Sequence, residues 1–139
     1  MKKITAISLS SLGYIVATFG MALLWHLHWF EELYDSLGYI SREEPIIVFG
    51  FFSILIQGII LSIAYQVVAK GRYGLSSSLI FCGVVYVFFW SIHVLAFSAK
   101  AYLSNTLLFI GIETVYLALQ FLVFALMLGP VFKKVLGDS

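Results

Sequence analysis

The chain has 139 residues, of which 62% are hydrophobic and 11% are charged, and its formal net charge is +1. An ordinary soluble domain carries about 25% charged residues and a small domain buries only about two-thirds of its surface, so this composition excludes a soluble enzyme domain, a disordered chain and a fibrous protein. The small net charge gives no indication of a nucleic-acid partner, and the single cysteine, Cys82, excludes an internal disulfide.

Four long apolar segments follow one another along the chain. Each exceeds the roughly 20 residues that a helix needs to cross the hydrocarbon core of a bilayer. None alternates between polar and apolar residues, as the strands of a membrane barrel would. We therefore predict an all-α, polytopic membrane protein in which one domain, residues 1–139, forms a bundle of four transmembrane helices, with spans at about residues 4–30, 45–69, 76–98 and 105–128.

The first span ends in an aromatic and histidine-rich stretch, Trp25-His26-Leu27-His28-Trp29. It is longer than the apolar region of a signal peptide, which has about 7–15 residues, so we expect a retained helix. Residues two apart point in different directions on an α-helix, so His26 and His28 are not expected to chelate one metal. We expect His28 to pair with Glu32, and Trp25 and Trp29 to lie in the interfacial aromatic belt.

The acidic loop at residues 31–44 separates the first two spans. Three of its residues are spaced to form the apolar face of a short interfacial helix: Leu33, Tyr34 and Leu37. Ser41 with Glu44 three residues later predicts a capping box, and Pro45 is then an early residue of the second helix.

Helix stop and start signals occur at the remaining boundaries. Gly71 follows the second span, and Gly129-Pro130 follows the fourth, where both are expected to end a helix. Ser104 and Asn105 precede the fourth span and are candidates for its N-cap.

The basic residues divide unevenly between the two sides of the predicted bundle. Arg42 and Lys100 fall on the side of the acidic loop, whereas six bases fall on the side of the termini: Lys2, Lys3, Lys70, Arg72, Lys133 and Lys134. Cytoplasmic loops carry an excess of lysine and arginine. The charge distribution therefore predicts a multi-pass protein of a bacterial cytoplasmic membrane with both termini in the cytoplasm.

Titratable residues inside a span are costly, at about 2.5–3.5 kcal/mol for a central acid or base. At 1.5 Å per residue, His26, His93 and Glu113 lie roughly 6, 8 and 12 Å below the outer boundary of the bilayer. Gln57 lies near the midplane and Gln120 lies deeper. The three titratable residues, each from a different helix, are thus expected to occupy the same outer half of the bundle.

Helical phase places the polar residues of each span on one stripe. Glu113, Tyr116 and Gln120 are spaced i, i+3 and i+7. Lipid would not favour exposure of such stripes, so they are expected to face the bundle interior. We predict a polar pocket in the outer half that is lined by His26, His93 and Glu113 and floored by Gln57. Tyr116 and Gln120 are further candidates for ligand or proton binding.

Three chemical interpretations of this pocket stay open. Two histidines and a carboxylate, His26, His93 and Glu113, could ligate a divalent metal. The same residues could bind a proton or a small molecule. Alternatively, Glu113 could hydrogen-bond to Tyr116, Gln57 or His93 and only hold the helices together. The sequence does not identify a cofactor.

The chain resembles small four-helix bacterial integral membrane proteins that are grouped as domains of unknown function. Four features carry the resemblance: the stretch from Gly20 to His26 that closes the first helix, the polar outer loop, Pro45 at the start of the second helix, and the Gln57-Gly58 pair within it. The resemblance covers most of the chain. It implies a four-helix fold and a membrane location, and it carries no catalytic assignment.

The sequence therefore predicts only a broad class of function. We expect a non-enzymatic binding or accessory subunit with the lipid bilayer, other membrane subunits or a second copy as partners. A proton-coupled small-molecule transporter that uses Glu113, or a metal-binding membrane protein, is the alternative.

Overall fold

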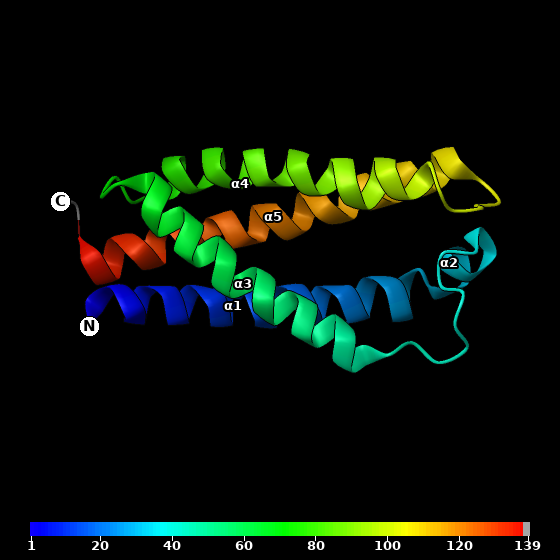
Figure 1. Ribbon diagram of the computed structural model, residues 1–139, viewed down its shortest axis with the longest axis horizontal. Helices are drawn as coiled ribbons and strands as arrows, with labels where there is room; N and C mark the ends of the chain where they lie inside the picture. Colours follow the sequence, from blue (N-terminus) through cyan, green and yellow to red (C-terminus); the bar gives the residue numbers. More distant parts are fainter. Residues whose placement is uncertain (138–139) are drawn as a thin grey trace.

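The computed structural model describes residues 1–137 and is helical, with no strand in that part of the chain (Figure 1). Four of its helical stretches are long and apolar enough to cross a membrane. The all-α, four-helix prediction is thus confirmed. In chain order the elements are α1 (Lys2–Leu24), the π-helical segment η1 (Trp25–Trp29), α2 (Glu31–Leu37), α3 (Ile47–Ala69), α4 (Leu75–Trp90), the π-helical segment η2 (Ser91–Ala96) and α5 (Thr106–Leu136).

The bundle is built around α1 and α5. Helix α3 packs mainly on α1, and α4 packs mainly on α5, whereas α3 and α4 contact each other little. The N-terminus, the end of α5 and the α3–α4 turn lie at one end of the bundle, and α2 and the α4–α5 loop lie at the other (Figure 1). We call these the terminal end and the α2 end.

The core lies along α5, whose inward face carries a row of buried residues: Phe109, Phe121, Phe124, Leu128 and Phe132. Tyr14 of α1 packs edge-on against Phe124, with 4.7 Å between the ring centroids. The outward faces of α3 and α4 expose large apolar residues such as Ile60 and Val84. Extended exposed apolar surface of this kind is typical of contact with lipid or with other membrane proteins.

Helix α5 does not end at Gly129-Pro130, so that prediction was wrong. The helix continues to Leu136 with Pro130 inside it. The proline lacks an N–H and removes one bond of the helix, but tertiary packing outweighs this loss. Phe132 is fully buried, and its ring lies 5.1 Å from Tyr65 and 5.3 Å from Tyr73.

The predicted capping box before α3 is also absent. The N-cap of α3 is Ile46, without a side-chain cap, and Pro45 lies outside the helix. The reason is that a residue before proline disfavours the helical region, so Glu44 cannot occupy the third helical position of a capping box. The stop at Gly71 and the cap at Asn105 are confirmed: Gly71 has a φ of +86°, and the Asn105 side chain accepts from the Leu108 N–H at 3.1 Å.

Candidate functional site

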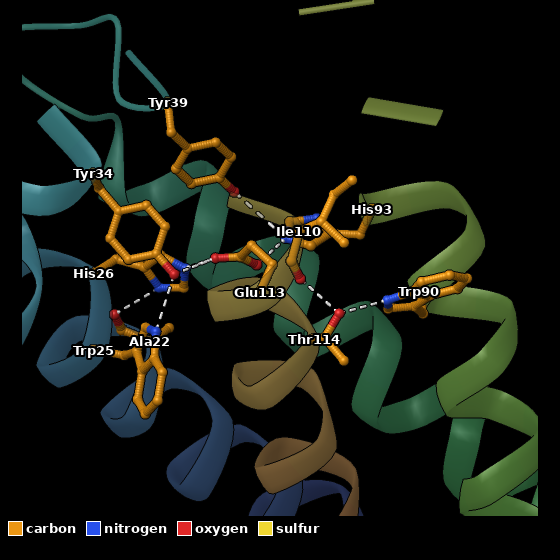
Figure 2. Close-up of polar contacts among 10 residues, drawn as sticks. All are labelled: Ala22, Trp25, His26, Tyr34, Tyr39, Trp90, His93, Ile110, Glu113 and Thr114. Carbon is orange, nitrogen blue, oxygen red and sulfur yellow. Dashed lines mark hydrogen bonds and ion pairs between the residues drawn. The ribbon is translucent and has the colours of Figure 1, made fainter. Parts of the chain in front are cut away.

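Both histidines of the predicted site lie in π-helical segments near the α2 end of the bundle. His26 lies in η1, directly after α1, and His93 lies in η2, directly after α4. A π turn widens the helix and changes the direction of the side chains around it, and such turns are frequent at functional sites. The two rings approach Glu113 of α5 from opposite sides (Figure 2).

The Glu113 carboxylate is fully buried and is bonded by side chains from three other elements. His26 Nε2 lies 2.9 Å from Oε1, and His93 Nε2 lies 2.8 Å from Oε2. The Tyr34 hydroxyl of α2 donates to Oε1 (Figure 2). The structure thus brings together His26, His93 and Glu113, which we call the His–Glu cluster, and adds a tyrosine that the sequence did not identify as a site residue.

Trp25 supports this tyrosine. Its indole N–H donates to the Tyr34 hydroxyl at 3.0 Å, so the phenol accepts one bond and donates the next to Glu113. Trp25 is only 8% exposed, whereas Trp29 is 61% exposed. The prediction that Trp25 lies in the interfacial aromatic belt was therefore wrong, because the Trp25 ring packs inward against Phe30 and Tyr116.

A second connection holds α4 against α5 beside the cluster. The Trp90 indole N–H donates to the Thr114 hydroxyl at 2.8 Å, and that hydroxyl donates to the Ile110 carbonyl at 2.6 Å (Figure 2). Trp90 immediately precedes η2 and Thr114 immediately follows Glu113. This contact therefore fixes the approach of His93 to the carboxylate.

Two tyrosines outside the spans face the cluster, Tyr34 from α2 and Tyr39 from the loop after it. The Tyr39 hydroxyl lies 3.5 Å from His93 Nε2. Burial, and after it the negative charge of Glu113, raise the pKa of both phenols above the ordinary tyrosine value. Both hydroxyls consequently keep their protons at physiological pH and serve as neutral hydrogen-bonding groups.

The hydrogen bonds of His26 constrain the number of protons in the cluster. Its Nδ1 lies 3.2 Å from the Ala22 carbonyl oxygen, which can only accept, so Nδ1 carries a proton. Its Nε2 faces a carboxylate oxygen, and that contact also needs a hydrogen. His26 and Glu113 therefore hold two protons between them, either as imidazolium and carboxylate or as two neutral groups. With a neutral His93, the buried cluster carries no net charge, which avoids the penalty of an unpaired buried ion.

The two predicted amides form a separate, deeper network. The Tyr14 hydroxyl of α1 donates to Gln57 Oε1 and accepts from Gln120 Nε2, each at 2.8 Å. Neither amide hydrogen-bonds to the His–Glu cluster. Tyr116 contributes its ring, which lies edge-on to His26 with 4.5 Å between centroids. Tyr14 was not predicted as a site residue, although its position one turn before Thr18 on the polar stripe of α1 is a usable signal.

Two cavities adjoin the cluster, an outer one between α3 and the α4–η2 helix and an inner one among α1, α3, α4 and α5. The outer one, of about 350 Å³, has Lys100 in its wall, and the inner one, of about 150 Å³, has His26 and Gln120 in its wall. The two share three lining residues, Gln57, Phe89 and His93. The His93 side chain is 37% exposed, so the cluster can be reached from these cavities although Glu113 itself is buried.

The predicted pairing of His28 with Glu32 is not found among the described residues. His28 is exposed, and the helix breaks at Phe30, whose φ of −124° and ψ of 19° end the i, i+4 register. The pairing was therefore wrong because it assumed one continuous α-helix.

The metal site at His26, His93 and Glu113 stays a prediction. The two imidazole Nε2 atoms contact different oxygens of the carboxylate, and within residues 1–137 no group of three or more ligating side chains is arranged to hold a metal ion. No family model, curated protein or solved structure matches this chain. The arrangement can hold a shared proton at the His26–Glu113 contact and can offer His93 and Gln57 to a molecule in the cavities.

Proposed function

We propose that this chain is a multi-pass integral membrane protein with both termini in the cytoplasm, and that it acts as a binding or accessory subunit. Four apolar helices support the membrane location. Six of the eight lysine and arginine residues occur near the ends of the chain and in the α3–α4 turn, at one end of the bundle, whereas Arg42 and Lys100 belong to the loops of the α2 end (Figure 1). An excess of lysine and arginine marks the cytoplasmic side. The α2 end then faces outward.

The proposed ligand is a hydrophobic small molecule with a hydrogen-bonding head group. The observation that carries this proposal is the pair of cavities beside the His–Glu cluster. The wall of the outer cavity is largely aromatic and aliphatic, and the polar groups that converge on it are His93, Gln57 and Lys100. Apolar pockets with a few convergent polar groups are the common form of small-molecule sites. The lysine favours a head group that accepts hydrogen bonds or is acidic.

Filling the outer cavity tests this proposal. Ile92 lines that cavity, whereas Leu95 of the same segment does not, and both are exposed. The protein is extracted from its native membrane, and the lipophilic compounds that remain bound are identified by mass spectrometry. We expect Ile92→Trp to lower the amount of the bound compound about tenfold, as the loss of about 1.4 kcal/mol of binding would. Leu95→Trp should retain it.

Two outcomes of this experiment oppose the proposal. One is a wild-type protein that carries no compound above a detergent blank. The other is equal retention of the compound by Ile92→Trp and Leu95→Trp, which would place the compound elsewhere on the protein.

Proton-coupled transport is the second candidate function. The observation that favours it is the His26–Glu113 contact, which holds two protons beside a cavity. If ligand and proton compete there, the compound found by extraction should release about one proton per chain when added to weakly buffered protein. Glu113→Gln should release none, and Glu44→Gln in the exposed loop should behave like the wild type. Binding without proton release would exclude this mechanism.

A further inference from the structure

A third cavity, larger than the two beside the His–Glu cluster, lies at the terminal end of the bundle. It has a volume of about 780 Å³ and lies between the last turns of α3, the α3–α4 turn and the first half of α4. This volume is within the range of about 300–1,000 Å³ that small-molecule sites occupy. The low contact between α3 and α4 leaves this space open along the side of the bundle.

The lining of this cavity changes from polar to apolar along α4. Arg72 of the turn, together with Ser76 and Ser77 at the start of α4, forms the polar part. The apolar part continues along the same helix: Ile80, Phe81, Val84 and Val85. At 1.5 Å per residue, the wall from Ser76 to Val85 extends about 13 Å into the span.

The polar part is hydrogen-bonded and basic. The Tyr65 hydroxyl of α3 lies 2.6 Å from the Ser77 hydroxyl, which joins the two walls of the cavity. Arg72 is exposed at its mouth, and no aspartate or glutamate occurs in the sequence between Glu44 and Glu113. Neither α3, the turn nor α4 therefore provides a carboxylate to compete for this guanidinium.

We propose that this cavity binds an anionic phospholipid, with the phosphate at Arg72 and one acyl chain along the apolar wall of α4. A guanidinium matches the geometry of a phosphate and can bind it through two parallel N–H groups. The apolar wall inside the span requires a hydrocarbon chain, which a free phosphate ion lacks. The site requires neither the His–Glu cluster nor its ligand, so it can be tested independently of the proposed function.

Lipid selectivity is the first test. Purified full-length protein in detergent receives phosphatidylglycerol, phosphatidylcholine with the same acyl chains, or sodium phosphate, and native mass spectrometry and thermal unfolding are recorded. We expect one retained phosphatidylglycerol per chain and a Tm several degrees higher than with phosphatidylcholine, because a ligand of the folded state stabilises it. Phosphate alone should leave the Tm unchanged. Equal effects of the two lipids, or an equal effect of phosphate, would overturn the proposal.

Matched variants locate the lipid. Arg72→Ala should weaken phosphatidylglycerol binding about tenfold, as expected for the loss of a charged hydrogen-bonding partner. Arg42→Ala removes the same charge from the loop at the α2 end and should leave binding unchanged. Val85→Trp fills the apolar part and should also lose the lipid, whereas Val87→Trp, on an exposed position of α4 outside the cavity lining, should keep it. Equal losses within either pair would place the lipid elsewhere and refute the assignment.

Discussion

Replacing Glu113 by leucine is expected to lower the free energy of unfolding by about 3–5 kcal/mol, because it leaves several buried hydrogen-bonding groups unpaired at about 1–3 kcal/mol each. The substitution leaves three donors without an acceptor: His26, His93 and Tyr34. Tyr34 in turn holds the Trp25 indole, so the defect extends to η1. Stability is measured in mixed micelles as the denaturing detergent is increased.

Glu113→Gln should be much milder, with a loss of about 1 kcal/mol. The amide oxygen can replace Oε1 and accept from Tyr34 and His26. The amide NH₂ then faces His93 Nε2, and neutral His93 can accept there by changing tautomer. Glu44 lies in the exposed loop, so Glu44→Leu and Glu44→Gln should each change stability by less than about 0.5 kcal/mol. A leucine variant as stable as the wild type would mean that the cluster contributes no stability.

Comparison of the two Glu113 variants separates a structural role of the His–Glu cluster from a binding role. The glutamine variant keeps the shape and most hydrogen bonds of the cluster but removes the carboxylate and its shared proton. If this variant folds normally and still binds the extracted compound without proton release, the carboxylate acts through protons. If it folds normally and loses the compound, the negative charge itself supports binding.

The spans and the shared depth of His26, His93 and Glu113 could be predicted because they depend on local quantities. Span positions follow from the length of apolar runs, and depth follows from the rise per residue. The phase of Glu113 on α5 follows from its spacing to Tyr116 and Gln120. These relations need no knowledge of how the helices pack, except that polar stripes avoid lipid.

The partner of Glu113 in α2 could not be predicted in the same way. Tyr34 and Glu113 are 79 residues apart in the sequence, and Tyr34 was expected only to form an apolar face. No periodicity relates a short helix at the end of the bundle to the buried face of α5. The π turns η1 and η2 could not be predicted from the sequence either, because the apolar pattern around His26 and His93 is compatible with a regular α-helix. Trp25 is the first residue of η1, and its ring packs inward against Phe30 and Tyr116.

The predicted end of α5 at Gly129-Pro130 was wrong for a related reason. Glycine and proline end most helices, but Gly129 has a packing function here. It faces the α3–α4 turn at Gly74 and the start of α4 at Ser78. The Ser78 hydroxyl is buried and donates to the Ala125 carbonyl at 2.8 Å, so a short side chain of α4 binds the backbone of α5 directly at this point. Only a residue without a side chain fits between them.

Gly129→Ala is therefore expected to destabilise the fold by about 2–3 kcal/mol, near the upper end of the usual effect of overpacking. A Cβ at this position would collide with the Gly74 carbonyl group and would lie 2.5 Å from Ser78 Oγ. The carbonyl belongs to the backbone of a tight turn and cannot rotate away, so α4 and α5 must separate. The measurement is the same unfolding titration in mixed micelles.

Gly83→Ala in α4 is the matched control. A Cβ there meets nothing within 4 Å, and alanine is favoured over glycine inside a helix by roughly 0.5–1 kcal/mol. This variant should be as stable as the wild type or slightly more stable. If the two alanine variants had the same stability, α4 and α5 would not be in close contact at Gly129. The uninterrupted course of α5 through Pro130 would then lack the packing that we hold responsible for it.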